Sequence, residues 1–553
     1  MVSKTDALHQ KLTESEIGTI RKPWRGRIRI ALVYPNRYHI GMSNLGFQTI
    51  YQFLNSFDHV VCERAFLPDN NSGAHHQLKT IESDKPLTDT DIVAFSISFE
   101  NDYPHILSIL ESAGIAYRSS QRSEHDPLVI AGGVTCFLNP EPIAAFIDCF
   151  LIGEAESILP RFLDVYESQP DKKTLLKAVA QNVTGAYVPS FYKTDYNSDG
   201  TLSAFDPLDS VPQKIERVFS KDISQFSTHS AIITPHTTFE SAFLVEVGRG
   251  CPHGCRFCAA GFIYRPPRFR PISVLDAAMK RGIVQTDTIG LVGAAVSDLP
   301  GIRQLCRQFQ NTDVRIAFSS LRADRLAPEL LAVLKQSKVK TATIAPEAGT
   351  QRLRDVIKKG IEEEDVLKAV SALVENGIPN LKLYFMIGLP TETEADVDGI
   401  IALGKHIKHR FLKSSRTRNQ IGTITISLNC FVPKPFTPFQ WIAMEDVTGL
   451  KKKQKKIKAE LRKIANVRVH ADIPRWAYIQ ALFSRGDRRV ADILTMAHAY
   501  NGNWAQTLKT IPMNPDFYVH RQRHFGELLP WDFIDHGIQK SFLWKEYQRA
   551  QTV

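Results

Sequence analysis

Three cysteines crowd into the short stretch GRGCPHGCRFCAAGF, residues 248–262, in a C-x3-C-x2-C array. They are Cys251, Cys255 and Cys258. Cysteine thiolates hold iron–sulfur clusters, usually four to a four-iron cube, so three close ligands leave one iron open to another molecule. The alternatives are a zinc site completed by His253 or Cys306, or thiols that are only buried. A second pair of closely spaced cysteines, as zinc sites of this kind use, does not occur in the sequence, and this favours the cluster.

Two regions of alternating strands and helices are predicted to position this loop. In the first, apolar β-branched segments at 27–36, 91–99, 127–134 and 146–157 alternate with stretches of helical spacing. This pattern is typical of a Rossmann-like, doubly wound parallel sheet, whose ligand lies at the carboxyl ends of the strands. The polar and small residues at those ends are Asn36, Ser96, Ser98, Gly132, Gly133 and Gly153.

The second region starts at FLVEVGRG, immediately before the cysteines. Five further strand patterns follow it: TIGLVGAA, VRIAFSSLR, TATIAPEAG, LKLYFMIGLP and GTITISLNCFVP. Six parallel strands around one centre predict a partial (β/α)6 barrel with its chemistry at the strand carboxyl ends. The α/β chain is thus divided into an N-terminal extension (1–25), the Rossmann-like domain (26–166), a connecting segment (167–239), the barrel (240–440) and a basic, mainly helical C-terminal domain (441–553).

Composition narrows the class of protein. The 553 residues are 43% hydrophobic and 23% charged, with no apolar run long enough for a membrane span and no secretory signal in the polar first residues. Eight cysteines are too few for a disulfide scaffold, so we expect a soluble, cytoplasmic protein. The net charge is +10, and part of the excess of basic residues lies at 405–420 and 451–464. These stretches allow RNA as a partner. For the second stretch a solvated amphipathic helix is the simpler interpretation.

The cysteine array, with aromatic Phe257 before its last cysteine, resembles the signature of the radical S-adenosylmethionine (SAM) superfamily. The resemblance implies that the three cysteines bind a [4Fe-4S] cluster and that the amino and carboxylate groups of SAM chelate the fourth iron. Reductive cleavage of SAM would then give a 5'-deoxyadenosyl radical, so an electron donor such as flavodoxin or ferredoxin is implied as a partner. The barrel would orient these cofactors and exclude water.

Four later strand ends resemble the SAM contacts of this family. LVGAAVSD stands where the family has a Gly-Gly-Glu motif; only the glycine matches, so backbone carbonyls must replace the glutamate. FSSLR resembles the strand that brings a serine and an arginine to the SAM carboxylate, APEAGT places a glutamate for the ribose, and MIGLPTET resembles the turn against adenine. The residues implied are Gly293, Ser320, Arg322, Glu347, Ile387 and Gly388.

A doubly wound domain ahead of such a barrel resembles the cobalamin-binding domain of B12-dependent radical SAM enzymes. AFSIS and IAGGV resemble the serine and glycine strand ends that accept the corrinoid and its nucleotide tail, because glycine lets the backbone approach a bulky ligand. The D-x-H-x-x-G motif that supplies a cobalt ligand is absent, so His39 is expected to be a loop residue. A degenerate domain kept for packing is the alternative.

Together with VYPNRYHIGMSNLG, APEAGTQRLRDVIKKG and LPWDFID, these motifs make the chain similar to a group of B12-binding radical SAM proteins. The implied activity is methylation of an unactivated carbon; no side chain is assigned as a general acid or base. One alternative is a cobalamin-independent radical SAM enzyme catalysing rearrangement, cyclisation or RNA modification. Another is an RNA-binding regulatory module, in which C-terminal aromatic residues could stack a base. Sulfur insertion is disfavoured because the other cysteines are scattered: Cys62, Cys136, Cys149, Cys306 and Cys430.

Overall fold

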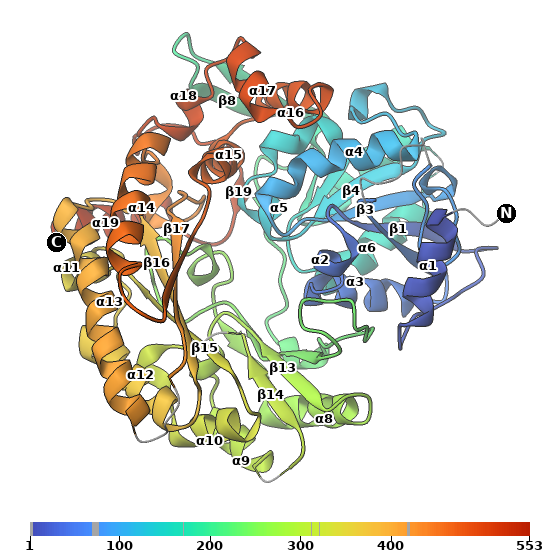
Figure 1. Cartoon of the computed structure of the whole chain (residues 1–553). Helices are drawn as coiled ribbons and strands as arrows, with labels where there is room; N and C mark the ends of the chain where they lie inside the picture. Colours follow the sequence, from blue (N-terminus) through green and yellow to red (C-terminus); the bar gives the residue numbers. More distant parts are fainter. Residues whose placement is uncertain (1–3, 69–76, 170, 311, 320, 417–420) are drawn as a thin grey trace.

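The N-terminal domain faces the barrel strands, and the C-terminal helices join the two. This arrangement comes from a computed structural model, which describes residues 4–68, 77–169, 171–310, 312–319, 321–416 and 421–553. In Figure 1 the N-terminal domain is blue to cyan, the barrel green to orange, and the bridging helices red. Within these described ranges no helix is both long enough and apolar enough to span a bilayer.

The N-terminal domain is a doubly wound sheet with strand order β2-β1-β3-β4-β5-β6, in which only β6 is antiparallel. Its strands are β1 (Ile28–Tyr34), β2 (Val60–Phe66), β3 (Ile92–Ser96), β4 (Leu128–Gly132), β5 (Cys149–Leu151) and β6 (Ala186–Tyr187). Its helices are α2 (Tyr38–Gly41), α3 (Leu45–Asn55), α4 (Tyr103–Ala113), α5 (Val134–Leu138), α6 (Ala155–Glu167) and α7 (Lys172–Asn182), preceded by α1 (Lys4–Glu14). The strand order reverses between β1 and β3, where ligands of such sheets bind.

Strand β2 was not predicted, because its sequence VVCERAF carries two charged residues. Both are buried in the structure. Arg64 is bound by Glu16 at 2.7 Å and by Glu82 at 2.6 Å, so its charge is neutralised inside the domain. Glu16 belongs to the N-terminal extension, which this ion pair therefore ties to the sheet.

The segment after the first domain contains a two-stranded hairpin and one short strand that pairs far along the chain. The hairpin consists of β7 (Tyr192–Tyr196) and β8 (Leu202–Pro207). Strand β9 (Ile215–Glu216) pairs in parallel with β19 (Ile534–Asp535), close to the C-terminus. The connecting segment is thus attached to the C-terminal region.

The barrel consists of two parallel sheets, of order β10-β13-β14 and β15-β16-β17-β18, joined by a bridge between Leu321 and Ile344. The predicted six strands are β10 (Phe243–Glu246), β13 (Thr288–Val292), β14 (Arg315–Phe318), β15 (Thr341–Glu347), β16 (Asn380–Ile387) and β17 (Ile424–Cys430). A seventh, β18 (Val467–Ala471), continues the sheet beyond residue 440, where the sequence pattern of strands faded. The predicted α/β class with parallel sheets is confirmed.

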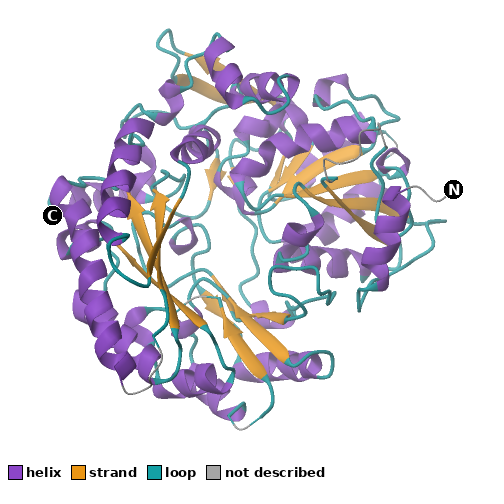
Figure 2. Cartoon of the chain, viewed as in Figure 1, coloured by secondary structure: helices purple, strands orange, loops and turns teal. Residues whose placement is uncertain are grey.

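Helices cover the outer face of the barrel strands, as Figure 2 shows in purple. They are α8 (Ile272–Ile283), α9 (Ile302–Gln308), α10 (Pro328–Gln336), α11 (Gln351–Val356), α12 (Glu363–Glu375), α13 (Glu394–Ser415) and α14 (Val447–Leu461). The last part of the chain adds α15 (Pro474–Arg485), α16 (Val490–Ala499), α17 (Trp504–Thr510), α18 (Asp516–Val519) and α19 (Lys540–Gln551).

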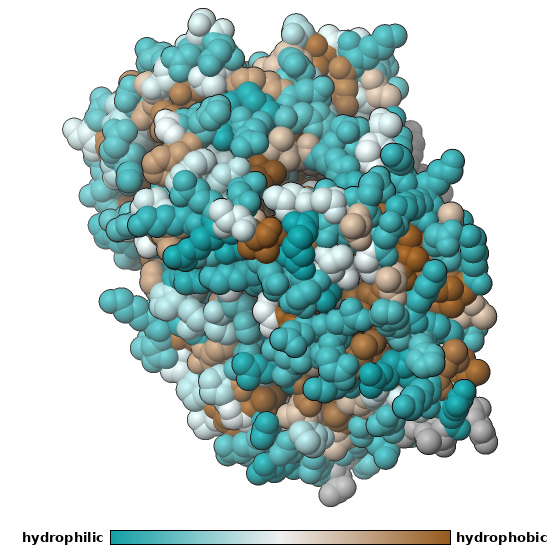
Figure 3. Space-filling view, turned by 90° about the vertical axis from the view of Figure 1, so that its left-hand side faces the viewer, coloured by the Kyte–Doolittle hydropathy of each residue, from teal (hydrophilic) through white to brown (hydrophobic). Residues whose placement is uncertain are grey.

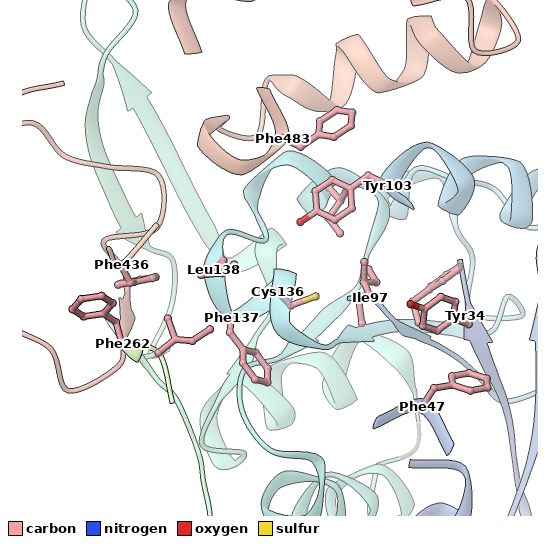
Figure 4. Close-up of a cluster of buried hydrophobic side chains, with 14 of the residues drawn as sticks. Tyr34, Phe47, Ile97, Tyr103, Cys136, Phe137, Leu138, Phe262, Phe436 and Phe483 are labelled. Carbon is pink, nitrogen blue, oxygen red and sulfur yellow. The ribbon is translucent and has the colours of Figure 1, made fainter. Parts of the chain in front are cut away.

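One buried cluster connects the three parts of the molecule (Figure 4). Tyr103 of the N-terminal domain lies 5.5 Å from Phe483 of α15, measured between ring centres. Phe137 of α5 accepts a hydrogen bond at its carbonyl oxygen from His536, at 2.8 Å. The motif LPWDFID therefore packs where the domains meet, and its Trp531 donates to Gln440 at 2.8 Å.

Candidate functional site

The three cysteines lie in the loop that follows β11 (Gly248–Arg249). Cys255 is buried, and Cys251 and Cys258 are half-buried. Burial raises the pKa of the Cys255 thiol to about 11 and raises the pKa of the other two thiols as well. Thiolates at these positions therefore require a strong positive charge, which a bound metal supplies. Among the described residues no three histidine, cysteine or carboxylate side chains are grouped closely enough for a single metal ion.

The middle of this loop is fastened to two elements from later in the chain. The amide of Arg256 donates to the carbonyl of Ile357 at 2.9 Å, and its guanidinium donates to the carbonyl of Val356 at 2.8 Å. The same guanidinium donates to Glu546 of α19 at 3.3 Å. The C-terminal helix is thus part of the wall around the cysteines, which the sequence alone did not indicate.

His253, inside the cysteine array, faces Asp298 instead of the cysteines. Its Nε2 lies 3.0 Å from Asp298 Oδ2. Burial opposes ionisation of Asp298, but the hydrogen bond and charge of His253, with Arg322 and Arg325, lower its pKa. Cys306, the other residue considered for zinc, is buried on α9.

Two of the predicted SAM contacts lie at the carboxyl ends of β13 and β14. Gly293 is held by Ser319, whose hydroxyl accepts from the glycine amide at 3.2 Å and donates to its carbonyl at 3.1 Å. Ser319 was not singled out in the sequence, and its neighbour Ser320 lies outside the described residues. The guanidinium of Arg322 donates to Asp324 at 2.9 Å.

Glu347, at the end of β15, adopts a left-handed backbone conformation with φ of 68°. Such a conformation is unfavourable for a residue with a side chain and is concentrated at functional sites. Burial raises the pKa of Glu347, opposed by Lys359, whose Nζ lies 3.1 Å from its carboxylate. The charges of Lys359 and Arg322 also act on the Cys255 thiol, and that of Glu347 acts on the Cys258 thiol, so the structure brings the predicted Arg322 and Glu347 near the cysteines; Lys359 was not predicted.

The predicted adenine turn at the end of β16 is supported by helix α14. Gly388 has φ of 76°, and its amide donates to Glu392 at 2.8 Å. Lys453 of α14 lies 2.6 Å from Glu392 and 2.6 Å from Glu445. Ile387 is buried, and Phe257 of the cysteine loop packs, partly buried, against the same core.

A cavity of about 710 Å³ connects the N-terminal domain with the barrel. Its inner part is lined by the sheet and by α3 and α6, and its outer part by β10, β13 and β14. Four of the six residues predicted to bind cobalamin line it: Ser96, Gly132, Gly133 and Gly153. The described lining residues include no histidine, and His39 is exposed on α2.

The other two predicted residues do not line this cavity. Asn36 donates its amide to Asp102 at 2.8 Å, and Ser98 accepts from Asn44 at 3.0 Å. Two of the lining glycines are also required by close backbone packing. A Cβ at Gly133 would lie 2.3 Å from the Ile97 carbonyl oxygen, and one at Gly153 would lie 2.2 Å from that of Val218. Their identity alone therefore does not indicate a ligand.

A buried ion-pair network forms the polar wall of the cavity beside the cysteines. Arg249, two residues before Cys251, lies 2.6 Å from Glu156, 3.0 Å from Glu154 and 3.1 Å from Glu246. Glu154 and Glu156 belong to the N-terminal domain, whereas Glu246 belongs to the barrel. The network, which the sequence did not reveal, fixes the start of the cysteine loop against the N-terminal domain.

Asp102 provides a test of the charges near the strand ends of the N-terminal domain. Burial, aided by the charge of Glu100, raises its pKa to about 6 although Asn36 donates a hydrogen bond to it. A folded-state pKa above the unfolded value means that stability falls as pH rises from about 4 through about 6. We expect Asp102→Asn to raise the free energy of unfolding by about 2–3 kcal/mol at pH 8.

Urea unfolding of both proteins at about pH 5 and pH 8 measures this effect. The gain from the substitution must be larger at pH 8 than at pH 5, because only the ionised carboxylate is penalised. An equal gain at both pH values would contradict the assignment.

The chain matches two protein-family models and is similar to one curated protein over most of its length. Residues 46–189 match the family described as "Radical SAM proteins, N-terminal", and residues 245–404 match "Radical SAM superfamily". "Uncharacterized protein MJ0966" of Methanocaldococcus jannaschii is 30% identical over 469 residues, which cover 84% of this chain and 90% of that protein.

Two solved structures also align with this chain. The methyltransferase TsrM of Kitasatospora setae, bound to tryptophan and a SAM analogue, has a TM-score of 0.46 at 13% identity, covering 72% of each chain. The radical enzyme OxsB, bound to aqua-cobalamin and SAM, has a TM-score of 0.48 at 13% identity, covering 95% of this chain and 79% of its own. The family matches place the cysteine loop inside the radical SAM region and the cavity across both matched regions. The chain therefore belongs to the radical SAM superfamily.

Proposed function

We propose that this protein is a B12-dependent radical SAM methyltransferase that methylates an unactivated carbon of its substrate. Cys251, Cys255 and Cys258 hold a [4Fe-4S] cluster, and cobalamin occupies the cavity between the domains. SAM binds at the strand ends described above, through Phe257, Gly293, Ser320, Arg322, Glu347, Ile387 and Gly388. The observation that carries this proposal is the cavity, which extends from inside the N-terminal domain to the barrel strand ends beside the cysteines.

The inner part of the cavity is unusual for a doubly wound domain, whose helices normally pack directly on the sheet. Ile30, Ala94 and Ile130 of the sheet face Phe53 and Phe162 of the helices across it. The lining of this inner part is mainly apolar, and the space is continuous with the barrel strand ends. The inner part therefore offers apolar surface that a ligand group could bury.

A corrinoid with its nucleotide tail suits both parts of this cavity. The tail would enter the apolar space between the sheet and helices α3 and α6, past Ser96 and Gly132. The flat macrocycle would lie over the strand ends, where Gly133 and Gly153 line the cavity, and would face the barrel. No histidine lines the cavity within the described residues, so the chain offers cobalt no imidazole from that wall.

The cofactors, when bound, supply the radical and the methyl group, and the chain's residues position them. Arg322 and Lys359 place two positive charges near the cysteines, which favours thiolates over thiols. Glu347 offers a carboxylate at a strand end, and Ser319 fixes the Gly293 backbone. Arg249 keeps the first cysteine against the cavity wall.

A cobalamin-independent radical SAM enzyme remains the second candidate, in which the first domain serves only for packing. The cavity is the observation against it, because a domain kept for packing would fill its interior. An RNA-binding module is the third candidate; Lys453 and Lys456 of the basic helix pair with neighbouring carboxylates, whereas Lys451 and Lys455 are exposed.

The test is to load and purify the protein without oxygen, in the presence of iron, sulfide and cobalamin, and to measure bound iron and corrinoid together. SAM and a reductant are then added, and deoxyadenosine is quantified. The proposal predicts about four irons and one corrinoid per chain, with deoxyadenosine formed. Iron and deoxyadenosine without corrinoid would leave a radical SAM enzyme and exclude the B12-dependent reaction.

A further inference from the structure

A group of basic side chains surrounds a buried carboxylate beside the cysteine loop. Glu546 of α19 lies 3.3 Å from Arg256, 3.1 Å from Lys358 and 2.6 Å from Arg549. We call Arg256, Lys358 and Arg549 the basic collar. Because three cations share one carboxylate, the collar keeps a surplus of positive charge.

This surplus lies at the surface, although the carboxylate itself is buried. The side chains of Lys358 and Arg549 are 51% and 68% exposed, whereas that of Arg256 is 8% exposed. Lys358 also lies over the loop itself: a Cβ built on Gly254, next to Cys255, would be 3.8 Å from its Nζ. The opposite side of the loop faces the N-terminal domain through Arg249 and Tyr264, which line the cavity. The collar therefore marks the outer side of the cysteine loop.

Helix α19 extends this surface with an exposed stripe. Phe542, Lys545 and Arg549 are exposed at positions i, i+3 and i+7, so they share one face of the helix. Phe525, also exposed, lies 5.4 Å from Trp544 of the same helix, between ring centres. Figure 3, which views the side of the molecule where α11 and α19 lie, shows a mainly hydrophilic surface with separate hydrophobic residues. A small apolar area with a charged margin suits a weak, transient partner.

We propose that the basic collar and the exposed face of α19 form the docking surface for an acidic electron-donor protein. This inference rests on the cluster of the proposed function, which must gain one electron from outside the chain. The donor loses one electron and the cluster gains it, and no covalent bond changes in this step. Opposite charges on the two surfaces accelerate their encounter and orient the donor toward the side of the loop that the N-terminal domain leaves uncovered.

The test removes the surplus charge while keeping the buried pair. Lys358→Gln with Arg549→Gln leaves Glu546 paired with Arg256. The cluster-loaded protein with SAM is mixed with reduced flavodoxin, an acidic donor, and cluster reduction is followed by absorbance and by electron paramagnetic resonance. We expect reduction to be about tenfold slower than in the wild type at low salt, and the difference to shrink at high salt. Reduction by dithionite should be unchanged.

The matched control is Lys451→Gln with Lys455→Gln, two exposed lysines of α14 whose loss changes the net charge equally. It should reduce at the wild-type rate. Lys545→Glu is a second collar-side variant that breaks no ion pair among the described residues and should also slow the donor. Equal slowing in the control, or no slowing in either collar-side variant while dithionite reduces the cluster, would overturn the docking surface. Failure of the wild type to assemble any cluster would instead refute the proposed function.

Discussion

Cys255→Ala is expected to give a folded protein that has lost its iron and forms no deoxyadenosine. Cys255 is buried and its thiol has a pKa of about 11, so it becomes a thiolate only through a bound metal. Only Cys251 and Cys258 would remain in the variant. Two thiolates leave two of the four irons of a cluster without a protein ligand, so the cluster is not held. Bound iron, the visible absorbance of the cluster and deoxyadenosine should therefore fall to background together, while circular dichroism remains that of the wild type.

Cys306→Ala is the matched control for this experiment. It removes a buried thiol of the same size from α9, where the cost is about 1 kcal/mol of stability. Iron and deoxyadenosine should stay at the wild-type level. Retention of SAM cleavage by Cys255→Ala, or loss of metal in Cys306→Ala, would refute the assignment of the three cysteines.

Ala94→Leu is expected to abolish corrinoid binding and at the same time stabilise the protein. Ala94 lies on the sheet face that borders the cavity, so the larger side chain would enter the space proposed for the nucleotide tail. In the ligand-free protein the added carbons bury apolar surface without displacing packed atoms, and about 1 kcal/mol of extra stability is expected. Corrinoid content after cobalamin uptake and urea unfolding of the ligand-free protein measure the two effects.

Val93→Leu, one residue earlier on β3, provides the opposite result. Val93 is fully buried on the other face of the strand and does not line the cavity, so the larger side chain overpacks the core. Its free energy of unfolding should fall by about 1–3 kcal/mol while corrinoid still binds. Corrinoid bound normally by Ala94→Leu would refute the cavity as the cobalamin site.

The two pairs of variants test different parts of the proposed function. Cys255→Ala tests the radical chemistry that the family implies, and Ala94→Leu tests the cofactor that would turn this chemistry toward methyl transfer. If Ala94→Leu loses corrinoid but still forms deoxyadenosine, the two cofactor sites are separable.

Much of this protein was determined by local sequence patterns. The spacing of Cys251, Cys255 and Cys258, the alternation of strands and helices and the glycines after β4 are local features, because periodicity and turn chemistry depend on neighbours in the chain. Strand β2 escaped prediction because Arg64 and Glu63 interrupt its apolar pattern, and the carboxylates that neutralise Arg64 come from distant segments. Strand β18 was not predicted either, because it is short and follows a strongly basic helix.

Only the tertiary structure decided which residues surround the cysteines and whether the first domain is hollow. Glu546 meets Arg256 across 290 positions of the chain, and Arg249 meets Glu156 across 93. No local pattern encodes such pairs, because they form only when separate elements pack against one another. The cavity likewise depends on how far α3 and α6 stand from the sheet, which is the sum of many side-chain contacts. The sequence by itself determined the class of chemistry, and the packing of distant elements decided where the cofactors and their donor could bind.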